Sequence, residues 1–251
     1  LLLIPETGTK ERITAQNAAQ DALQETLGGK SALTLMLSFL GSTVVTPLLS
    51  FFRNNGLKIG LMLLCFIFLF KIGEAFMGKM SIIFYKEVGF SKSDIAIYSK
   101  GLGWVVTVVS SLLGAYVAVR SGVVRALLLA GLVMAGTNLL FSVLAWSGKV
   151  EWLFALAVVI DDLAAAIATV IFVAFISLLV DRNYTATQYA LLASIGTLGR
   201  TFLASSSGAL VDWLNGDWGT FFIITAVMVG PSLAVLWWMR GTLTSLDRKK
   251  G

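Results

Sequence analysis

Six long apolar runs follow one another between Leu57 and Arg240, and short polar or charged segments separate them. Each run has roughly twenty to thirty residues, and a helix of about 20 residues covers the hydrocarbon core of a bilayer. We therefore predict an all-α integral membrane protein, built as a six-helix transmembrane bundle. The expected spans are residues 57–84, 94–119, 123–146, 151–180, 186–211 and 219–239.

The segment ahead of these runs has the composition of a linker. Residues 6–30 are rich in Gln, Thr, Ala and Gly, with charges of both signs. Residues 31–52 are more apolar, but serine, threonine and glycine dilute this stretch and Pro47 interrupts it. We expect residues 31–52 to hold an interfacial helix that leads into the membrane, with a further membrane span as the alternative.

The start of the chain is apolar and ends at a proline. Leu1–Ile4 followed by Pro5 resembles the last turn of an earlier transmembrane helix, because proline cannot continue a helix. We therefore expect the chain to be a C-terminal piece of a longer protein, with a frayed tail or a missing start residue as the alternative. The expected division is a cytoplasmic linker with the interfacial helix (1–55), the transmembrane bundle (56–240) and a cytoplasmic tail (241–251).

Composition agrees with a membrane protein and excludes several other classes. Hydrophobic residues make up 57% of the chain and charged residues 13%, and the mean hydropathy is +0.86. A net charge of +5 could suggest nucleic acid, but the basic residues lie mainly at helix ends and in the tails, as membrane orientation requires. The chain has no histidine and one cysteine, Cys65 inside an apolar run. We therefore expect no catalytic centre, no metal site and no cofactor.

Lysine and arginine are distributed unevenly among the segments between the spans. Most of them lie before the first span, between the second and third spans, between the fourth and fifth spans and in the C-terminal tail. This indicates that these segments are on the cytoplasmic side. Both termini are then expected in the cytoplasm. Tryptophan prefers the membrane interface; we expect Trp146, Trp152, Trp213 and Trp218 at the outer boundary and Trp237 and Trp238 at the inner one.

Charged residues that lie inside the apolar runs include Lys71, Glu74, Lys100, Asp161, Asp162 and Arg200. At about 1.5 Å per residue, Lys71 lies about 20 Å beyond Lys58, and Asp161 lies about 13 Å below the outer edge. Allowing for tilt, the residues named here share a broad layer in the outer half of the bilayer. Charged side chains at such a depth are costly unless they are paired or hydrated, so we expect them to face the bundle interior.

The spacing of these charges also predicts the faces on which they lie. Lys71, Glu74 and Gly78 follow an i, i+3, i+7 pattern and share one side of a helix. Asp161 and Asp162 point about 100° apart, so one of them is expected to face a neighbouring helix. Two interpretations stay open. The charges line a polar pathway in which Glu74 or Asp161 carries a proton, or they form a static salt-bridge network that fixes helix packing.

Three pairs of small residues, four positions apart, predict close contacts between helices. They are Ser110 with Gly114, Gly131 with Ala135, and Ala204 with Gly208.

The segment Tyr184-Thr185-Ala186-Thr187-Gln188-Tyr189-Ala190-Leu191-Leu192, followed by Gly199-Arg200, resembles a signature of the AmpG-type muropeptide permeases. These belong to the major facilitator superfamily, in a branch that also holds the acetyl-CoA transporters. Phe70-Lys71-Ile72-Gly73-Glu74-Ala75-Phe76 is similar to the first helix of their second half, where an Asp commonly stands in place of Glu74. Segments 51–55, 88–91, 100–103 and 125–128 fit in the same order, so the resemblance covers about residues 46–240.

The resemblance implies a twelve-helix major facilitator fold in the inner membrane, to which this chain supplies the C-terminal half. It implies a symporter that uses the proton gradient to import anhydro-muropeptides for peptidoglycan recycling. The expected partners are the lipid bilayer, a small amphiphilic substrate and an N-terminal six-helix half.

The resemblance also suggests roles for particular residues. We expect Lys71, Lys100 and Arg200 to bind the carboxylates of the substrate. Glu74, Asp161 and Asp162 are expected to couple proton movement. Arg120 and Arg125 flank a turn that is similar to a reduced form of the superfamily's gating loop, with simple anchoring on the cytoplasmic side as the alternative. The family pattern has Glu-Asn where this chain has Asp161-Asp162, so its specificity or proton coupling is expected to differ.

Two other functions are alternatives to a muropeptide permease. An acetyl-CoA or other organic-anion transporter of the same superfamily would use the same cationic layer. An intramembrane enzyme would need a nucleophile, a base or a metal, and a chain with no histidine and one cysteine among apolar neighbours offers little for this.

Overall fold

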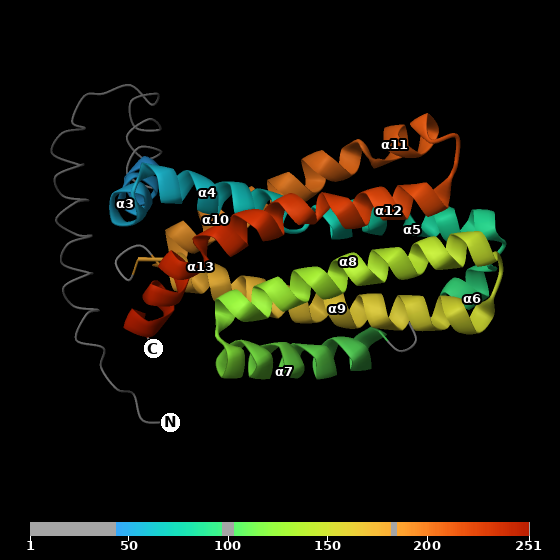
Figure 1. The fold of residues 1–251 in the computed structure, drawn as a ribbon, viewed down its shortest axis with the longest axis horizontal. Helices are drawn as coiled ribbons and strands as arrows, with labels where there is room; N and C mark the ends of the chain where they lie inside the picture. The colour runs from blue at the N-terminus through green and yellow to red at the C-terminus, as the bar shows by residue number, and fades with distance from the viewer. Residues whose placement is uncertain (1–43, 97–102, 182–184, 251) are drawn as a thin grey trace, which may run out of the picture.

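The computed structural model describes residues 44–96, 103–181 and 185–250, and every regular element within these ranges is a helix (Figure 1). This confirms the predicted all-α class, while the assignment to a major facilitator half stays a prediction. In chain order the helices are α3 (Thr46–Asn55), α4 (Leu57–Leu69), α5 (Ile72–Val88), α6 (Lys92–Ala96), α7 (Gly103–Ser121), α8 (Val123–Ser147), α9 (Glu151–Leu179), α10 (Thr185–Ser205), α11 (Ser207–Trp213), α12 (Trp218–Met228) and α13 (Gly230–Lys250).

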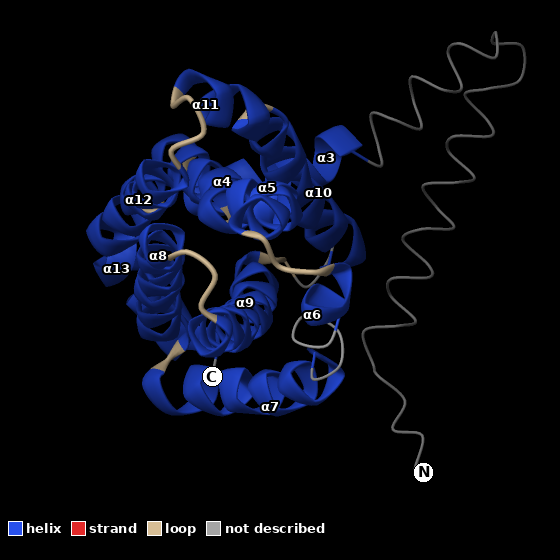
Figure 2. Cartoon of the chain, turned by 90° about the vertical axis from the view of Figure 1, so that its right-hand side faces the viewer, coloured by secondary structure: helices blue, strands red, loops and turns tan. Residues whose placement is uncertain are grey.

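The long helices run back and forth along one axis (Figure 1). α4 and α5 lead from the end that carries α3, called here the α3 end, to the end that carries α6, called the α6 end. α7 returns, and α8, α9, the α10–α11 pair and the α12–α13 pair then alternate in direction. Along this axis, α7 lies at one edge of the bundle beside α8 and α9, and α11 lies at the opposite edge (Figure 2).

Four helical stretches are long and apolar enough to cross a membrane: Leu57–Val88, Val123–Ser147, Glu151–Leu179 and Trp218–Leu243. They match the first, third, fourth and sixth predicted spans in position, length and apolar composition. The second span is described as a shorter apolar helix, Val106–Ser121, and residues 97–102 of that span lie outside the described residues. The fifth, in α10 and α11, is helical but less apolar, because threonine, serine, glycine and Arg200 dilute it. These two spans stay predictions.

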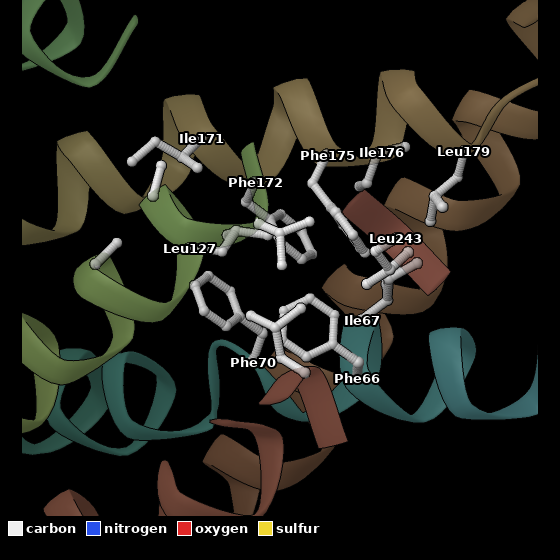
Figure 3. Packing of buried hydrophobic residues seen from close by; sticks show 14 of the residues in the cluster. Phe66, Ile67, Phe70, Leu127, Ile171, Phe172, Phe175, Ile176, Leu179 and Leu243 are labelled. Atoms are coloured by element: carbon white, nitrogen blue, oxygen red, sulfur yellow. The ribbon is translucent and has the colours of Figure 1, made fainter. Parts of the chain in front are cut away.

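The apolar interior is divided into two clusters along the axis. At the α3 end, aromatic rings of α4 pack against rings of α9 (Figure 3). Phe70 stacks on Phe172 with ring centroids 5.3 Å apart, and Phe66 meets Phe175 edge-on at 5.2 Å. A second cluster at the α6 end joins α5, α8, α9 and α12. Along the chain, Lys71 lies between the last residue of the first cluster in this stretch and the first residue of the second, and Asp161 and Asp162 lie between the two clusters in α9.

Two of the three predicted small-residue contacts are present. A Cβ added at Gly114 would lie 3.1 Å from the Ile167 carbonyl oxygen, so α7 and α9 approach closely there. Gly131 likewise packs against the Leu233 side chain of α13. At Gly208 the described residues show a looser contact, since a Cβ there would meet the flexible end of Met80 at 3.9 Å, so the close approach predicted for this pair stays a prediction.

One tryptophan differs from its predicted place at the membrane boundary. Trp146, Trp152 and Trp213 are exposed at the α6 end, whereas Trp218 is buried. Its ring packs against Phe84, and its indole N–H donates a hydrogen bond of 2.6 Å to the Glu87 carboxylate. The carboxylate supplies the partner that a buried indole requires, so Trp218 belongs to the second cluster rather than to the boundary.

Helix α3 is docked onto the ends of α9 and α10. Phe51 is buried in the first cluster, and the Gln188 side chain donates a 2.9 Å hydrogen bond to the Pro47 carbonyl oxygen. Ser50 and Asn54 both donate to the Asp181 carboxylate. Leu49 is exposed on the other side of α3. α3 has ten residues, which is too short to span a bilayer, and residues 31–43 lie outside the described residues.

Candidate functional site

The first membrane-length stretch is interrupted where its charged residues begin. α4 ends at Leu69, and α5 begins at Ile72 after the turn Phe70–Lys71, in which Lys71 has φ −97° and ψ 18°. Next to this break, a Cβ added at Gly73 would lie 2.8 Å from the Val229 side chain and 3.3 Å from the Thr225 carbonyl oxygen. Glycine at this position therefore lets the start of α5 lie directly against α12.

Two cations share one carboxylate at this break. The Lys71 ammonium donates a 2.8 Å hydrogen bond to Glu74 Oε2, and Arg200 Nη2 of α10 lies 3.7 Å from Glu74 Oε1. The side chains of Lys71 and Glu74 are 13% and 17% exposed, whereas that of Arg200 is 52% exposed. Lys71 also donates to the Thr169 hydroxyl of α9 at 2.7 Å. These four residues, called the charge cluster, join α5, α9 and α10.

The two adjacent aspartates of α9 face different neighbours. Asp161 accepts a 2.8 Å hydrogen bond from the Thr137 hydroxyl of α8. Asp162 lines an open hollow of about 380 Å³ between α7 and α9. Among the described residues, neither carboxylate lies within ion-pair distance of a lysine or arginine. The divergence expected from their 100° separation is therefore present, but the aspartates do not pair with the described cations of their layer.

The hollow beside Asp162 is lined mainly by hydroxyl groups and small side chains. Its lining comprises Thr107, Ser111, Asp162, Ala165, Ala166, Thr169 and Val170. Thr169 belongs to both features, because it lines the hollow and accepts the hydrogen bond of Lys71. The charge cluster and the hollow are therefore adjacent, and together they offer cations, a carboxylate and hydroxyls.

The remaining predicted site residues are not part of this region. Arg120 and Arg125 are exposed on either side of Gly122, at the α3 end, where α7 turns into α8 (Figure 1). Gly122 has φ +79°, in the left-handed region that favours glycine, so one residue suffices for this turn. Lys100 lies outside the described residues.

Sequence reasoning missed the neutral polar residues of the region. Thr169 and Thr137 hold Lys71 and Asp161, and Asn138 is 2% exposed beside Gly73. Their signal in the sequence is weak, since threonine is common in transmembrane helices and often bonds to its own backbone. Asn138 was the more visible clue, because a carboxamide is expensive inside an apolar run.

No family model matches the chain. It is 32% identical over 205 residues to the anhydromuropeptide permease of Escherichia coli K12, an alignment that covers 81% of this chain and 41% of that protein. It is 31% identical over 198 residues to a Rickettsia conorii protein described as transporter AmpG 4, covering 79% of this chain and 47% of the relative. The chain belongs to the AmpG permease family.

Further AmpG relatives agree with this assignment. A Rickettsia felis protein described as transporter AmpG 4 is 29% identical over 216 residues, which cover 86% of this AmpG-family chain and 51% of the relative. The chain thus spans about half the length of the curated relatives it matches. Membership and the four apolar stretches establish a multi-pass membrane protein of a transporter family.

Proposed function

We propose that this chain is the C-terminal six-helix half of a proton-coupled permease of the major facilitator superfamily that imports anhydro-muropeptides for peptidoglycan recycling. In this proposal it lies in the inner membrane with the α3 end on the cytoplasmic side. The relatives described as AmpG transporters and as an anhydromuropeptide permease support this substrate class rather than an acetyl-CoA ester. The observation that carries the proposal is the charge cluster at the break between α4 and α5.

The charge cluster has the composition of a site for an anionic group. Two cations and one carboxylate leave one positive charge uncompensated within the cluster. Arg200 holds Glu74 at 3.7 Å, longer than a hydrogen bond, and about half of its side chain is exposed. Its planar fork of N–H donors is therefore available for bidentate binding of a ligand carboxylate. Lys71, held by Glu74 and Thr169, supplies the second positive charge.

The helix break strengthens this preference for anions. The first N–H groups of α5 have no acceptor within their own helix, and the N-terminal end of a helix carries a partial positive charge. Transporters use such interrupted helices near the middle of the bilayer to bind substrates. Lys71 lies at this end of α5, so the backbone and the Lys71 ammonium favour the same kind of ligand, and the Glu74 carboxylate holds that ammonium in place.

The adjacent hollow suits the neutral part of the substrate. Thr107, Ser111 and Thr169 contribute hydroxyls, and the Asp162 carboxylate accepts hydrogen bonds from hydroxyl or amide groups. Sugars and peptides carry both kinds of group. We therefore assign the carboxylates of the muropeptide to the charge cluster and its uncharged polar groups to the hollow.

The polar surface around the cluster requires a cover other than lipid. Arg200, Thr197, Thr169 and Ser177 are exposed on helices assigned to the membrane. Polar and charged groups at membrane depth face protein or water rather than hydrocarbon. We assign this cover to the N-terminal six-helix half, with the substrate path between the halves and alternating access by rocking of one half against the other.

Glu74, Asp161 and Asp162 are the proposed proton carriers. Glu74 is bound to the cations that take the substrate, so a change in its protonation would alter the charge offered to the substrate. Asp161 and Asp162 lie apart from the described cations, at the level of the hollow. Lys100 is proposed as a further substrate-binding cation. Arg120 and Arg125 are proposed as the gating turn at the cytoplasmic end.

Uptake measurements on the complete transporter test this proposal. Lys71→Ala and Arg200→Ala are each expected to lower uptake of labelled anhydro-muropeptide by about tenfold or more, since a hydrogen bond to a charged group contributes roughly 1.5–3 kcal/mol. Lys92→Ala is the matched control, because Lys92 is an exposed cation at the α6 end. Unchanged uptake in both cluster variants at normal expression would contradict the proposal.

A further inference from the structure

The hollow between α7 and α9 offers hydrogen-bond acceptors to a ligand. The Ser111 hydroxyl donates a 2.7 Å hydrogen bond to the Thr107 carbonyl oxygen of its own helix. The Thr169 hydroxyl likewise donates one of 2.7 Å to the Ala165 carbonyl oxygen. A hydroxyl has a single hydrogen, so these two present only lone pairs to the hollow. The Asp162 carboxylate, when ionised, is also an acceptor only.

The Asp162 carboxylate gives this acceptor surface a negative charge. Among the residues that the structure describes, no lysine or arginine lies within ion-pair distance of it. The aliphatic members of the lining, Ala165, Ala166 and Val170, bring no polar side-chain group. A charge at membrane depth is costly unless it is paired or hydrated. A ligand group with a positive charge and several N–H donors would pair with Asp162 and bind the hydroxyl oxygens at the same time.

The contact between Thr169 and Lys71 shows which donor fits this surface. The Thr169 hydroxyl oxygen accepts a 2.7 Å hydrogen bond from the Lys71 ammonium, at the border between the charge cluster and the hollow. A primary ammonium therefore binds a hydroxyl of this kind within the protein itself. A bare cation such as Ca²⁺ fits less well, because it needs about six to eight oxygens at roughly 2.3–2.6 Å, and the hollow is open with a volume of about 380 Å³.

We propose that the hollow binds a primary ammonium group of the transported ligand, with Asp162 as its counter-ion and the Ser111 and Thr169 hydroxyls as hydrogen-bond acceptors. The charge cluster leaves one positive charge uncompensated, the hollow carries one negative charge, and Thr169 belongs to both. Together they match a ligand with a carboxylate and an ammonium group. This inference rests on the proposed function and narrows its substrate class to muropeptides whose peptide carries a free amine.

Binding to the purified complete transporter tests the inference, because binding can be measured without proton-driven uptake. The probes are an anhydro-muropeptide with a free primary amine in its peptide and the same compound with a hydroxyl in place of that amine. The two differ little in size, and only the amine is charged. Hydrogen bonds that involve a charged group are stronger than neutral ones, so isothermal titration calorimetry should show at least about fivefold tighter binding of the amine.

Two variants locate this preference. Asp162→Asn removes the charge at nearly unchanged size and is expected to reduce the preference for the amine below about twofold. Glu151→Gln is the matched control, because it removes an exposed acidic charge from the first turn of the same helix and should keep the preference. The inference is overturned if Asp162→Asn keeps the preference, or if both variants lose it equally, since general attraction of cations would then suffice.

The unchanged protein separates this inference from the proposed function. Equal binding of the two ligands overturns the inference alone, whereas binding of neither ligand contradicts the proposed function as well. If Asp162→Asn does not fold, Ser111→Ala decides, because it removes one acceptor and should weaken binding of the amine more than of the hydroxyl compound. Its control is Ser147→Ala, since Ser147 makes the same kind of hydrogen bond within α8 at the α6 end. Equal effects of the two serine variants would overturn the inference.

Discussion

Replacing Gly199 by alanine tests the packing that holds the charge cluster together. Gly199 lies in α10 immediately before Arg200, and its backbone rests on the last turn of α4. A Cβ added there would lie 2.9 Å from a ring carbon of Phe68, with the Phe68 carbonyl oxygen closer still. Carbon atoms in ordinary contact are about 3.5 Å apart. The two helices would therefore have to separate by about 0.5 Å or more, and a backbone oxygen cannot rotate away as a side chain can.

The energetic consequence follows from two opposing effects. Overpacking costs typically about 1–3 kcal/mol, whereas alanine in place of glycine within a helix gains up to about 1 kcal/mol. Gly136 is the matched control: it lies within α8, and an added Cβ there meets no atom within 4 Å. Only the helix gain applies at this position. Gly199→Ala is thus expected to be about 1–3 kcal/mol less stable than Gly136→Ala.

Thermal unfolding of the two variants in the same detergent measures this difference. At roughly 2–4 °C per kcal/mol, Gly199→Ala should melt at least about 2 °C below Gly136→Ala. The same displacement moves Arg200 away from Glu74, and their separation of 3.7 Å leaves little margin for an ion pair. Uptake by the complete transporter should therefore fall for Gly199→Ala only. Equal melting temperatures for the two variants would show that α10 does not pack on α4 as described.

Three further predictions concern other contacts. Asp217 caps α12, and hydrogen bonds from the Thr220 hydroxyl and backbone N–H hold the pKa of its carboxyl below the usual value. Asp217→Ala should lower the unfolding free energy by about 1 kcal/mol at pH 7. This difference should shrink as the pH falls below about 3.9 and through the lower pKa that Asp217 has in the folded protein, because the hydrogen bonds from Thr220 stabilise only the ionised carboxylate. Gln188→Ala removes a buried partner of the α3 backbone, so proteolysis within α3 should accelerate; an unchanged cleavage rate would contradict the docking. Thr137→Val, but not Thr137→Ser, should destabilise the chain by about 1–2 kcal/mol, measured by thermal unfolding, because Asp161 loses its hydroxyl donor.

The length of the apolar runs predicts most of the helical architecture, because the thickness of the bilayer sets the length of a membrane-spanning helix. The third and fourth predicted spans agree with α8 and α9 to within a residue or two. The interruption at Phe70–Lys71 was not predicted. No proline marks it, and it depends on how Gly73 packs against α12, which is a property of the folded bundle rather than of the local sequence.

The candidate site was predictable in part from the spacing of its residues along the helices. The i, i+3 spacing of Lys71 and Glu74 anticipates their ion pair, because the two positions share a helix face. Depth arithmetic also brings Arg200 to the level of Glu74. It does not reveal that Thr169 rather than an aspartate meets Lys71 from α9. Rotation of a helix about its own axis decides this contact, and rotation depends on packing with all neighbours.

The turn at Phe70 and Lys71 divides the first membrane stretch into two helices, α4 and α5, which can change their relative angle. Each helix keeps its own hydrogen bonds, so a change in this angle would require few of them to break. Lys71 lies in the turn itself, and Glu74 lies in the first turn of α5. A ligand that separates the two groups would therefore change the angle between α4 and α5. Breaking or forming the Lys71–Glu74 ion pair would then change how far the backbone bends at this turn.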